Sequence, residues 1–181
     1  MTLHRLSHLM APELGFSTLP AILRVLLCTD GTVTHSLAAY FDEPINVLCL
    51  RQESRPLSSV PTELDGEPGE TVIEREVLLQ GAASGRQYAH AWSTICVGAL
   101  DRDSRAMLDS GAAGIGELLA ARNLETCREI RRIGLRTTEA LQHFEADASG
   151  GVVFRDYVIH SGGKAVILVT EEFPVALYTG A

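Results

Sequence analysis

The sequence predicts an α+β fold, in which one antiparallel sheet of about five or six strands carries helices on one side. Three observations predict it. Several segments alternate in hydrophobicity or are rich in β-branched residues, which is typical of strands. Two pairs of these segments are joined by short turns that contain glycine, which favours antiparallel hairpins. Short segments with helical spacing lie before the first strand and in the middle of the chain, so the helices are expected to pack on the sheet.

Five segments are predicted to be strands. The first begins with alternating and β-branched residues at Ile45 and ends near Pro56. The second and third are joined by the turn GAASGRQ, and the fourth and fifth by a two-residue turn at Gly162-Gly163, so each pair is expected to form a hairpin. The predicted strands cover residues 45–56, 71–81, 88–100, 151–161 and 164–173.

Four further segments show helical features. Residues 17–28 begin with Ser-Thr, carry an early proline and continue with apolar residues at helical spacing, which predicts a short helix. Residues 33–41, after an Asp-Gly turn, fit a second short helix or a strand. Residues 101–121 are interrupted by glycines and are predicted to form two short helices flanking a glycine-rich bend. Residues 124–134 (LETCREIRRIG) are predicted to form a helix that ends at its final glycine.

The charge balance argues against a nucleic-acid binder, and the short apolar runs argue against a membrane protein. Of the 181 residues, 46% are hydrophobic and 21% are charged, and no repeat or change of composition divides the chain, so a single domain over residues 1–181 is expected. Lys and Arg number 15 against 23 Asp and Glu, and this net charge of −8 excludes a general nucleic-acid binder, which needs a basic face. No apolar run approaches the roughly 20 residues of a membrane span and no secretory signal is recognisable, so a cytoplasmic protein is expected.

The cysteines and histidines predict neither a disulfide framework nor a metal site. The cysteines lie among apolar residues without metal-like spacing, which is typical of buried, reduced thiols; they are Cys28, Cys49, Cys96 and Cys127. His4 and His8 are four residues apart and could share a helical face, but the sequence offers no third ligand near them. With no phosphate-binding loop or zinc-protease motif either, no metal and no organic cofactor are expected.

Charged residues lie at strand positions where alternation predicts burial. Arg75 shares its face of the second strand with apolar residues, and Glu171 does the same in the last strand. Arg155 follows the pattern less closely. Because the burial of an isolated charge is costly, two interpretations stay open. These side chains line a common polar pocket in an apolar sheet face, or they are edge residues or a buried structural ion pair.

The glycine-rich segment GAAGIGELL is a candidate anion site. Backbone N–H groups at a helix N-terminus, with no side chain in the way, can bind an anion. A plain break between two helices explains the same residues. The segment loosely resembles a dinucleotide-binding pattern, but it follows a helical stretch and so lacks the strand that this pattern requires.

In their order, these segments resemble the chorismate lyase (chorismate pyruvate-lyase, 4-hydroxybenzoate synthase) family. The resemblance covers residues 19–174, the expected core of the domain, and is carried by LPAILRVLLCTDGTVTHSL, EREVLL, GIGELL and FRDYVIHSGGKAVILVTEEFP. It implies a single antiparallel sheet of about six strands with helical flaps over an internal ligand pocket. It also implies a carbon–oxygen lyase that converts chorismate to 4-hydroxybenzoate and pyruvate without a cofactor. The TDGT turn and the loop at 80–87 depart from the best-known members, which leaves the pocket shape and the exact substrate open.

The resemblance implies roles for the two charged strand residues as catalytic groups. Arg75 matches the family arginine that binds a substrate carboxylate, because it begins the R-E-[IV]-L-L motif. Chorismate is a dianion, and arginine can hold a carboxylate in a two-pronged contact that lysine cannot copy. Glu171 matches the site carboxylate in the T-E-x-F motif. It would hydrogen-bond the C4 hydroxyl of chorismate and could act as general acid or base.

Further substrate contacts follow from the same resemblance. The family uses a backbone N–H just before the glycine of its L-G helix start, which matches Ile115 before Gly116. A second backbone contact, after the early Asp turn, matches Thr32 or Val33. Arg155 falls where the family also places basic residues, and its role, like that of a proton transfer at the site carboxylate, stays open.

Two alternative functions stay open beside this one. A related enzyme could process chorismate or isochorismate to another hydroxybenzoate. Ligand-sensing domains of certain bacterial transcription regulators share the fold and bind without reacting; these normally follow a winged helix, for which about 18 residues before the first helix are too few. The expected partner is chorismate, with no nucleic acid and no membrane span. Whether the protein is a monomer or a dimer, and which pathway uses the product, are left open.

Overall fold

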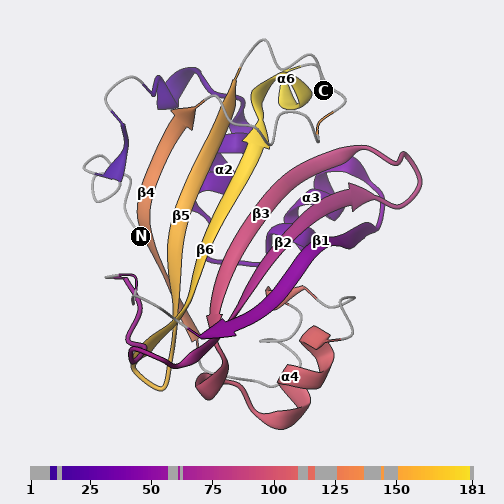
Figure 1. The fold of residues 1–181 in the computed structure, drawn as a ribbon. Coiled ribbons are helices and arrows are strands. Elements are labelled where there is room, and N and C mark those ends of the chain that lie inside the picture. Colours follow the sequence, from indigo (N-terminus) through magenta and orange to yellow (C-terminus); the bar gives the residue numbers. More distant parts are fainter. Residues whose placement is uncertain are drawn as a thin grey trace.

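Figure 1 shows a curved sheet of six antiparallel strands with helices α2 and α3 behind it. This computed structural model describes residues 9–11, 14–56, 61, 63–109, 114–116, 126–136, 144 and 151–179. The α+β class with a single antiparallel sheet is confirmed. The strands are β1 (Ile45–Pro56), β2 (Thr71–Gly81), β3 (Gln87–Cys96), β4 (Thr126–Arg136), β5 (Val152–Ser161) and β6 (Lys164–Pro174).

Two three-stranded meanders meet at the centre of the sheet, whose strand order is β1-β2-β3-β6-β5-β4. Each meander pairs its strands in chain order. The two are joined by the pairing of β3 with β6, from His90 opposite Glu172 to Ile95 opposite Ile167. All five predicted strands are confirmed; β3 ends earlier than expected because a short 3-10 helix, η3 (Val97–Ala99), follows it.

Helix α2 (Ala21–Cys28) covers part of the sheet with a wholly apolar side. It begins directly after Pro20, so the helix predicted over 17–28 starts later than expected, and Phe16–Thr18 form a separate 3-10 turn, η2. Proline suits this place because its fixed φ and its missing N–H are tolerated at a helix start. The side chains that α2 buries completely are Leu23, Leu26 and Leu27.

Helix α3 (Val33–Phe41) follows the Asp-Gly turn, which decides the segment that fitted either a helix or a strand. It ends where Asp42 takes a left-handed conformation with φ 55°. Phe41 stacks on Tyr88 of β3, with ring centroids 3.9 Å apart. Aromatic packing thus attaches the end of α3 to the first meander, while the start of the helix is left beside the sheet centre.

Strand β4 corrects the prediction of a helix over 124–134. A β-bulge after Ile130 shifts the pairing with β5, so that Ile130 and Ile133 both face the core although they are three residues apart. In a regular strand such residues would point to opposite faces. The bulge therefore produces an apolar spacing that imitates a helix, and for this reason the prediction is wrong.

The central part of the chain agrees with its prediction where the structure describes it. Helix α4 (Arg102–Asp109) is the first of the two helices predicted over 101–121. Of the glycine-rich bend, residues 114–116 are described, and the second predicted helix lies outside the described residues. His4 and His8 also lie outside them.

The burial predicted for all four cysteines is wrong for two of them. Cys96 is buried and Cys28 is partly buried, and in both cases burial raises the pKa of the thiol. Cys49 and Cys127 are exposed because they lie on β1 and β4, the two edge strands of the sheet. All four are free thiols.

The described residues contain neither a candidate metal cluster nor a membrane-spanning helix. No group of three or more His, Cys, Asp or Glu side chains in these residues could hold a metal ion. None of the helices in the same part of the chain combines the length and the apolar character needed to cross a membrane.

Candidate active site

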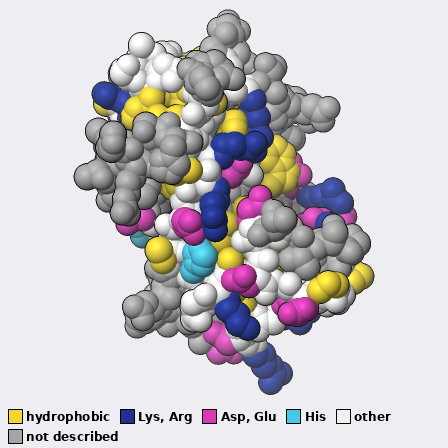
Figure 2. Space-filling view, turned by 90° about the vertical axis from the view of Figure 1, so that its left-hand side faces the viewer, with side chains coloured by type: hydrophobic (Ala, Val, Ile, Leu, Met, Phe, Trp, Pro, Cys, Tyr) yellow, Lys and Arg dark blue, Asp and Glu magenta, His cyan; other side chains and the backbone are white. Residues whose placement is uncertain are grey.

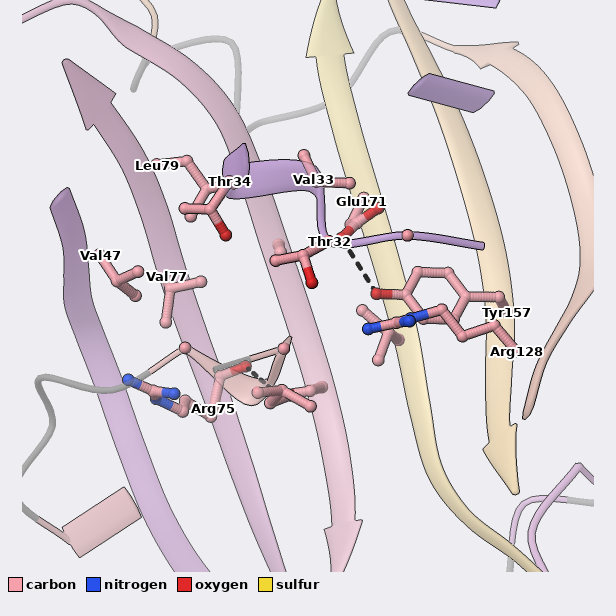
Figure 3. A pocket seen from close by; sticks show the side chains of 17 residues that line it. Thr32, Val33, Thr34, Val47, Arg75, Val77, Leu79, Arg128, Tyr157 and Glu171 are labelled. Carbon is pink, nitrogen blue, oxygen red and sulfur yellow. Dashed lines mark hydrogen bonds between the residues drawn. The ribbon is translucent and has the colours of Figure 1, made fainter. Parts of the chain in front are cut away.

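A cavity lies between the helix-covered face of the sheet and two segments that cross it, the start of α3 and residues 114–116 (Figure 3). The space open to the centre of a water-sized sphere is about 70 Å³, several times the roughly 10–15 Å³ that one water molecule needs. Most of the lining is apolar or small. The lining side chains that carry a charge or a phenol are Arg75, Arg128, Tyr157 and Glu171.

Glu171 on β6 has a fixed position at the wall of the cavity. It is 7% exposed, and its two oxygens have different partners. The Nε of Arg155, directly opposite on β5, donates a hydrogen bond of 2.7 Å to Oε2, and the Tyr157 hydroxyl donates one of 3.0 Å to Oε1. Arg155 also donates from Nη1 to the main-chain oxygen of Thr29, at 2.6 Å, so the same guanidinium ties β5 to the loop before α3.

The electrostatics of this group fix the protonation states of Arg155 and Tyr157. Burial works to lower the pKa of Arg155, but the attraction of its neighbours, chiefly the charge of Glu171 and the hydrogen bond to it, together outweighs burial and the pKa is raised. Burial, assisted by the same charge, raises the pKa of Tyr157 well above its usual range. Arg155 is therefore a cation and Tyr157 a neutral hydrogen-bond donor over the whole physiological pH range.

Arg75 lies at another part of the cavity wall, on β2. It is 3% exposed, so the burial that alternation predicted for it is observed. Its neighbours across the sheet are Gln52 on β1 and Ser93 on β3. Figure 3 shows its guanidinium near the side chains of Val47 and Val77, well apart from Glu171. An arginine among apolar walls is a strong site for a carboxylate, because few waters compete for it.

The two crossing segments approach each other closely at Gly116. A Cβ atom at this glycine would lie 2.8 Å from Cγ2 of Thr32, which is closer than atoms can pack. A Cβ at Gly114 would meet only Val47, at an ordinary 3.5 Å. Thr32 is the N-cap residue of α3. The absence of a side chain at Gly116 thus lets the two segments meet above the cavity.

The structure brings six of the seven predicted site residues to the lining of this one cavity: Thr32, Val33, Arg75, Ile115, Gly116 and Glu171. The seventh, Arg155, is paired with Glu171 from behind and does not belong to the lining. Both interpretations that the sequence left open therefore apply to Glu171, which lines a pocket and belongs to a buried ion pair. Its partner in that pair is Arg155 rather than Arg75.

Two polar lining residues were not predicted. Tyr157 is two positions after Arg155 on β5 and so shares its face, and this spacing could have identified it. Arg128 lies on β4, in the segment predicted as a helix, and no sequence signal placed it at the cavity.

Solved structures with the same fold include one described as a GntR-family transcriptional regulator, which superposes with a TM-score of 0.56 at 19% identity, covering 81% of this chain and 61% of that one. PhnF from Mycobacterium smegmatis superposes with a TM-score of 0.62 at 14% identity, covering 81% of this chain and 65% of that one. The effector domain of the same protein superposes with a TM-score of 0.57 at 12% identity, covering 80% and 88%. This chain therefore spans slightly less than two thirds of the whole PhnF chain. At such identities the likeness shows a common fold and nothing more.

Curated relatives and a family model complete the comparison. A protein named chorismate pyruvate-lyase from Mycobacterium leprae is 29% identical over 153 residues, covering 83% of this chain and 73% of the relative. One of the same name from Mycobacterium tuberculosis is 26% identical over 164 residues, covering 88% and 82%. The model of the family described as Rv2949c-like chorismate pyruvate-lyase matches residues 27–180. The chain thus belongs to the Rv2949c-like chorismate pyruvate-lyase family.

Proposed function

We propose that this protein converts chorismate to 4-hydroxybenzoate and pyruvate. The observation that carries the proposal is the placing of Arg75 and Glu171, both buried, on the wall of one cavity roofed by two chain segments. Family membership supports the same reaction, since the relatives from Mycobacterium leprae and Mycobacterium tuberculosis carry the name of this activity.

In this proposal Arg75 and the two crossing segments bind and orient the substrate. Arg75 holds the ring carboxylate in a two-pronged contact, and the backbone N–H groups of Ile115 and of Thr32 or Val33 are further donors. The apolar walls fit the ring. A single bound conformer is the main requirement, because the substrate itself supplies the driving force as its ring becomes aromatic.

In this proposal Glu171 is the group that accepts and then transfers the proton. It accepts a hydrogen bond from the C4 hydroxyl and takes up the proton that leaves C4. The electron pair of that C–H bond forms the new ring double bond, the C3–O ether bond breaks, and its electron pair passes to the enolpyruvyl oxygen. The proton then goes to the departing group, which becomes pyruvate. Arg155 and Tyr157 hold the carboxylate in place through both of its oxygens.

A second candidate function is ligand sensing, which the likeness to the PhnF effector domain and to the ligand-binding domain of a GntR-family transcriptional regulator favours. In that case the cavity binds an aromatic or enolpyruvyl acid and releases it unchanged. A third is a related lyase that gives a different hydroxybenzoate. The same experiment separates all three.

The test is incubation of the purified protein with chorismate, followed by chromatography and mass spectrometry of the products. We expect equal amounts of 4-hydroxybenzoate and pyruvate, at a rate that EDTA leaves unchanged. A different hydroxybenzoate would replace the proposal by the related lyase. Saturable binding of chorismate without turnover would replace it by the sensor.

A further inference from the structure

Arg128 brings a second lining arginine to the cavity, from β4. Figure 3 shows its guanidinium beside Tyr157, on the opposite side of the cavity from Arg75. Its Nη1 donates a hydrogen bond to the main-chain oxygen of Asp30, which orients the side chain toward the loop before α3. Burial and the charge of Glu171 raise the pKa of Tyr157, and the charge of Arg128 opposes them. The guanidinium therefore acts electrostatically on the group that surrounds Glu171.

The other arginines of β4 are engaged with carboxylates. Figure 2, which faces the side of the molecule where β4 forms the edge, shows dark blue arginine side chains among magenta carboxylates. The pairs are Arg131 with Glu129 at 3.1 Å, Arg132 with Asp156 at 2.7 Å and Arg136 with Glu172 at 2.7 Å. Among the residues that the structure describes, no carboxylate forms an ion pair with Arg128. Its charge is therefore available to an anion in the cavity.

The order of the polar groups across the sheet matches the order of the groups in chorismate. From one side to the other the strands present Arg75 on β2, Glu171 on β6, Tyr157 on β5 and Arg128 on β4. Strands are about 4.8 Å apart, so the four steps from β2 to β4 span about 19 Å along the sheet. Two arginines reaching inward from these strands leave room for a molecule with a negative charge at each end.

We propose that Arg128 binds the carboxylate of the enolpyruvyl group of chorismate, which makes the cavity a site for a dicarboxylate. This inference rests on the proposed function. With the ring carboxylate at Arg75 and the C4 hydroxyl at Glu171, the neighbouring C3 substituent extends past Glu171 toward Tyr157 and Arg128. The enolpyruvyl carboxylate is the remaining anionic group of the substrate, and Arg128 is the second cation among the described residues that line the cavity.

This assignment gives Arg128 a different part in the reaction from that of Arg75. The electron pair of the breaking ether bond moves into the enolpyruvyl group, so a cation at its carboxylate stabilises the charge that develops there. After the bond breaks, Arg128 holds pyruvate and no longer contacts the aromatic product. Arg75 binds the ring carboxylate before and after the reaction. In this assignment each arginine binds one product: Arg128 binds pyruvate, and Arg75 binds 4-hydroxybenzoate.

The test compares Arg128→Gln with Arg131→Gln, a control on the same strand whose arginine is exposed and paired with Glu129. Turnover of chorismate, inhibition by pyruvate and the Kd of 4-hydroxybenzoate are measured on each. For Arg128→Gln we expect kcat/KM to fall at least about 30-fold and inhibition by pyruvate to weaken, with the Kd of 4-hydroxybenzoate within about twofold of the unchanged protein. The control is expected to match the unchanged protein in all three.

Several results would overturn the inference. One is a folded Arg128→Gln variant with unchanged kcat/KM; another is a loss of affinity for 4-hydroxybenzoate as large as the loss for chorismate. Arg128 also donates a hydrogen bond to the main-chain oxygen of Asp30, so Arg128→Gln could act through this contact. Arg128→Lys therefore serves as a second variant, because it keeps a donor and a charge. It is expected to have more turnover than Arg128→Gln, with the Kd of 4-hydroxybenzoate unchanged. If the unchanged protein releases no pyruvate, the proposed function fails, and the inference is then judged by calorimetry alone. In that case Arg128→Gln must weaken binding of chorismate and spare that of 4-hydroxybenzoate.

Discussion

Arg155 and Glu171 are direct cross-strand partners on β5 and β6, and their side chains form an ion pair of 2.7 Å. Arg155 is 1% exposed and Glu171 7%, so the pair is almost completely removed from water. Yet one oxygen of Glu171 stays at the cavity wall, where Tyr157 reaches it. The same carboxylate is therefore part of the scaffold and of the proposed reaction, and its variants are expected to affect both stability and turnover.

Replacing Glu171 by glutamine is expected to lower both. The change leaves the Arg155 guanidinium buried without its counter-charge, which costs about 3–5 kcal/mol of unfolding free energy. It also removes the proton acceptor, so kcat of the folded fraction falls at least about 100-fold. Denaturant unfolding and steady-state kinetics on the same sample measure the two effects.

Glu172→Gln is the matched control for that variant. Glu172 is the next residue, is fully buried and accepts from Arg136 at 2.7 Å, but it points to the other face of the sheet. This variant is expected to lose stability, though less, because Arg136 is about one third exposed and can be hydrated. Its kcat should stay near that of the unchanged protein. An equal loss of kcat in both variants would assign Glu171 to the scaffold alone.

Replacing Arg75 by alanine is expected to act on catalysis. Loss of the two-pronged contact to a carboxylate costs on the order of 2–5 kcal/mol of transition-state binding, which is more than a roughly 30-fold drop in kcat/KM. Arg75→Lys should recover little of it, because an ammonium group is a point charge. The control is Arg55→Ala. Arg55 lies on the edge strand β1 and forms a partly exposed ion pair with Glu74 of β2, so its loss should leave kcat/KM unchanged. Recovery of full activity by lysine would contradict the two-pronged contact.

Replacing Gly116 by alanine is expected to disturb the roof of the cavity. The added Cβ would meet Thr32 at 2.8 Å, so one of the two crossing segments has to move. Displacement of groups that position the substrate by a fraction of an ångström to an ångström lowers kcat/KM by about 10-fold or more. Gly114→Ala, with an ordinary contact of 3.5 Å to Val47, should remain near the unchanged protein. A second change, Thr32→Ser, removes the clashing methyl group and should restore part of the activity of Gly116→Ala.

Glu43 is expected to make stability depend on pH at the acidic end. Its carboxylate accepts hydrogen bonds from the Ser84 and Tyr88 hydroxyls and from the backbone N–H groups of Ser84 and Ala83, and these lower its pKa from 4.5 to about 2. A depressed pKa contributes stability that is fully present above pH 4.5 and is lost as the pH falls through that value toward 2. The Tm of Glu43→Gln should therefore lie below that of the unchanged protein near neutral pH, and the two should converge near pH 2. A constant difference in Tm across this range would show that Glu43 contributes by packing alone.

The burial of Arg75 and Glu171 could be predicted from the sequence because each shares its strand face with residues that are otherwise apolar. In a strand the face of a side chain follows from counting by two, and an odd charge among apolar residues is visible. Arg155 fits this pattern less closely, although it is buried as well. Its pairing with Glu171 could not be predicted, because the register between two strands is set by the turn and by packing rather than by either strand alone.

Arg128 could not be found in the same way. The bulge after Ile130 breaks the count by two within β4, so the sequence offers a helical spacing where the chain is extended. A residue at the cavity end of an irregular edge strand carries no local signal of its position. Its position follows only from the pairing of β4 with β5, which places Arg128 opposite Ile159 and Ile130 opposite Tyr157.

The pairing of β3 with β6 joins residues that are 72 to 82 positions apart in the chain, from Ile95 with Ile167 to His90 with Glu172, and the cavity spans that pairing. Hairpins such as β2–β3 and β5–β6 close locally, on a timescale of about 1–10 μs. Contacts of long sequence separation form more slowly, because the intervening chain must first lose its freedom. During refolding, strand signal in circular dichroism should thus appear before any affinity for an aromatic acid. Arg75 and Glu171 face a common space only when the two meanders have docked.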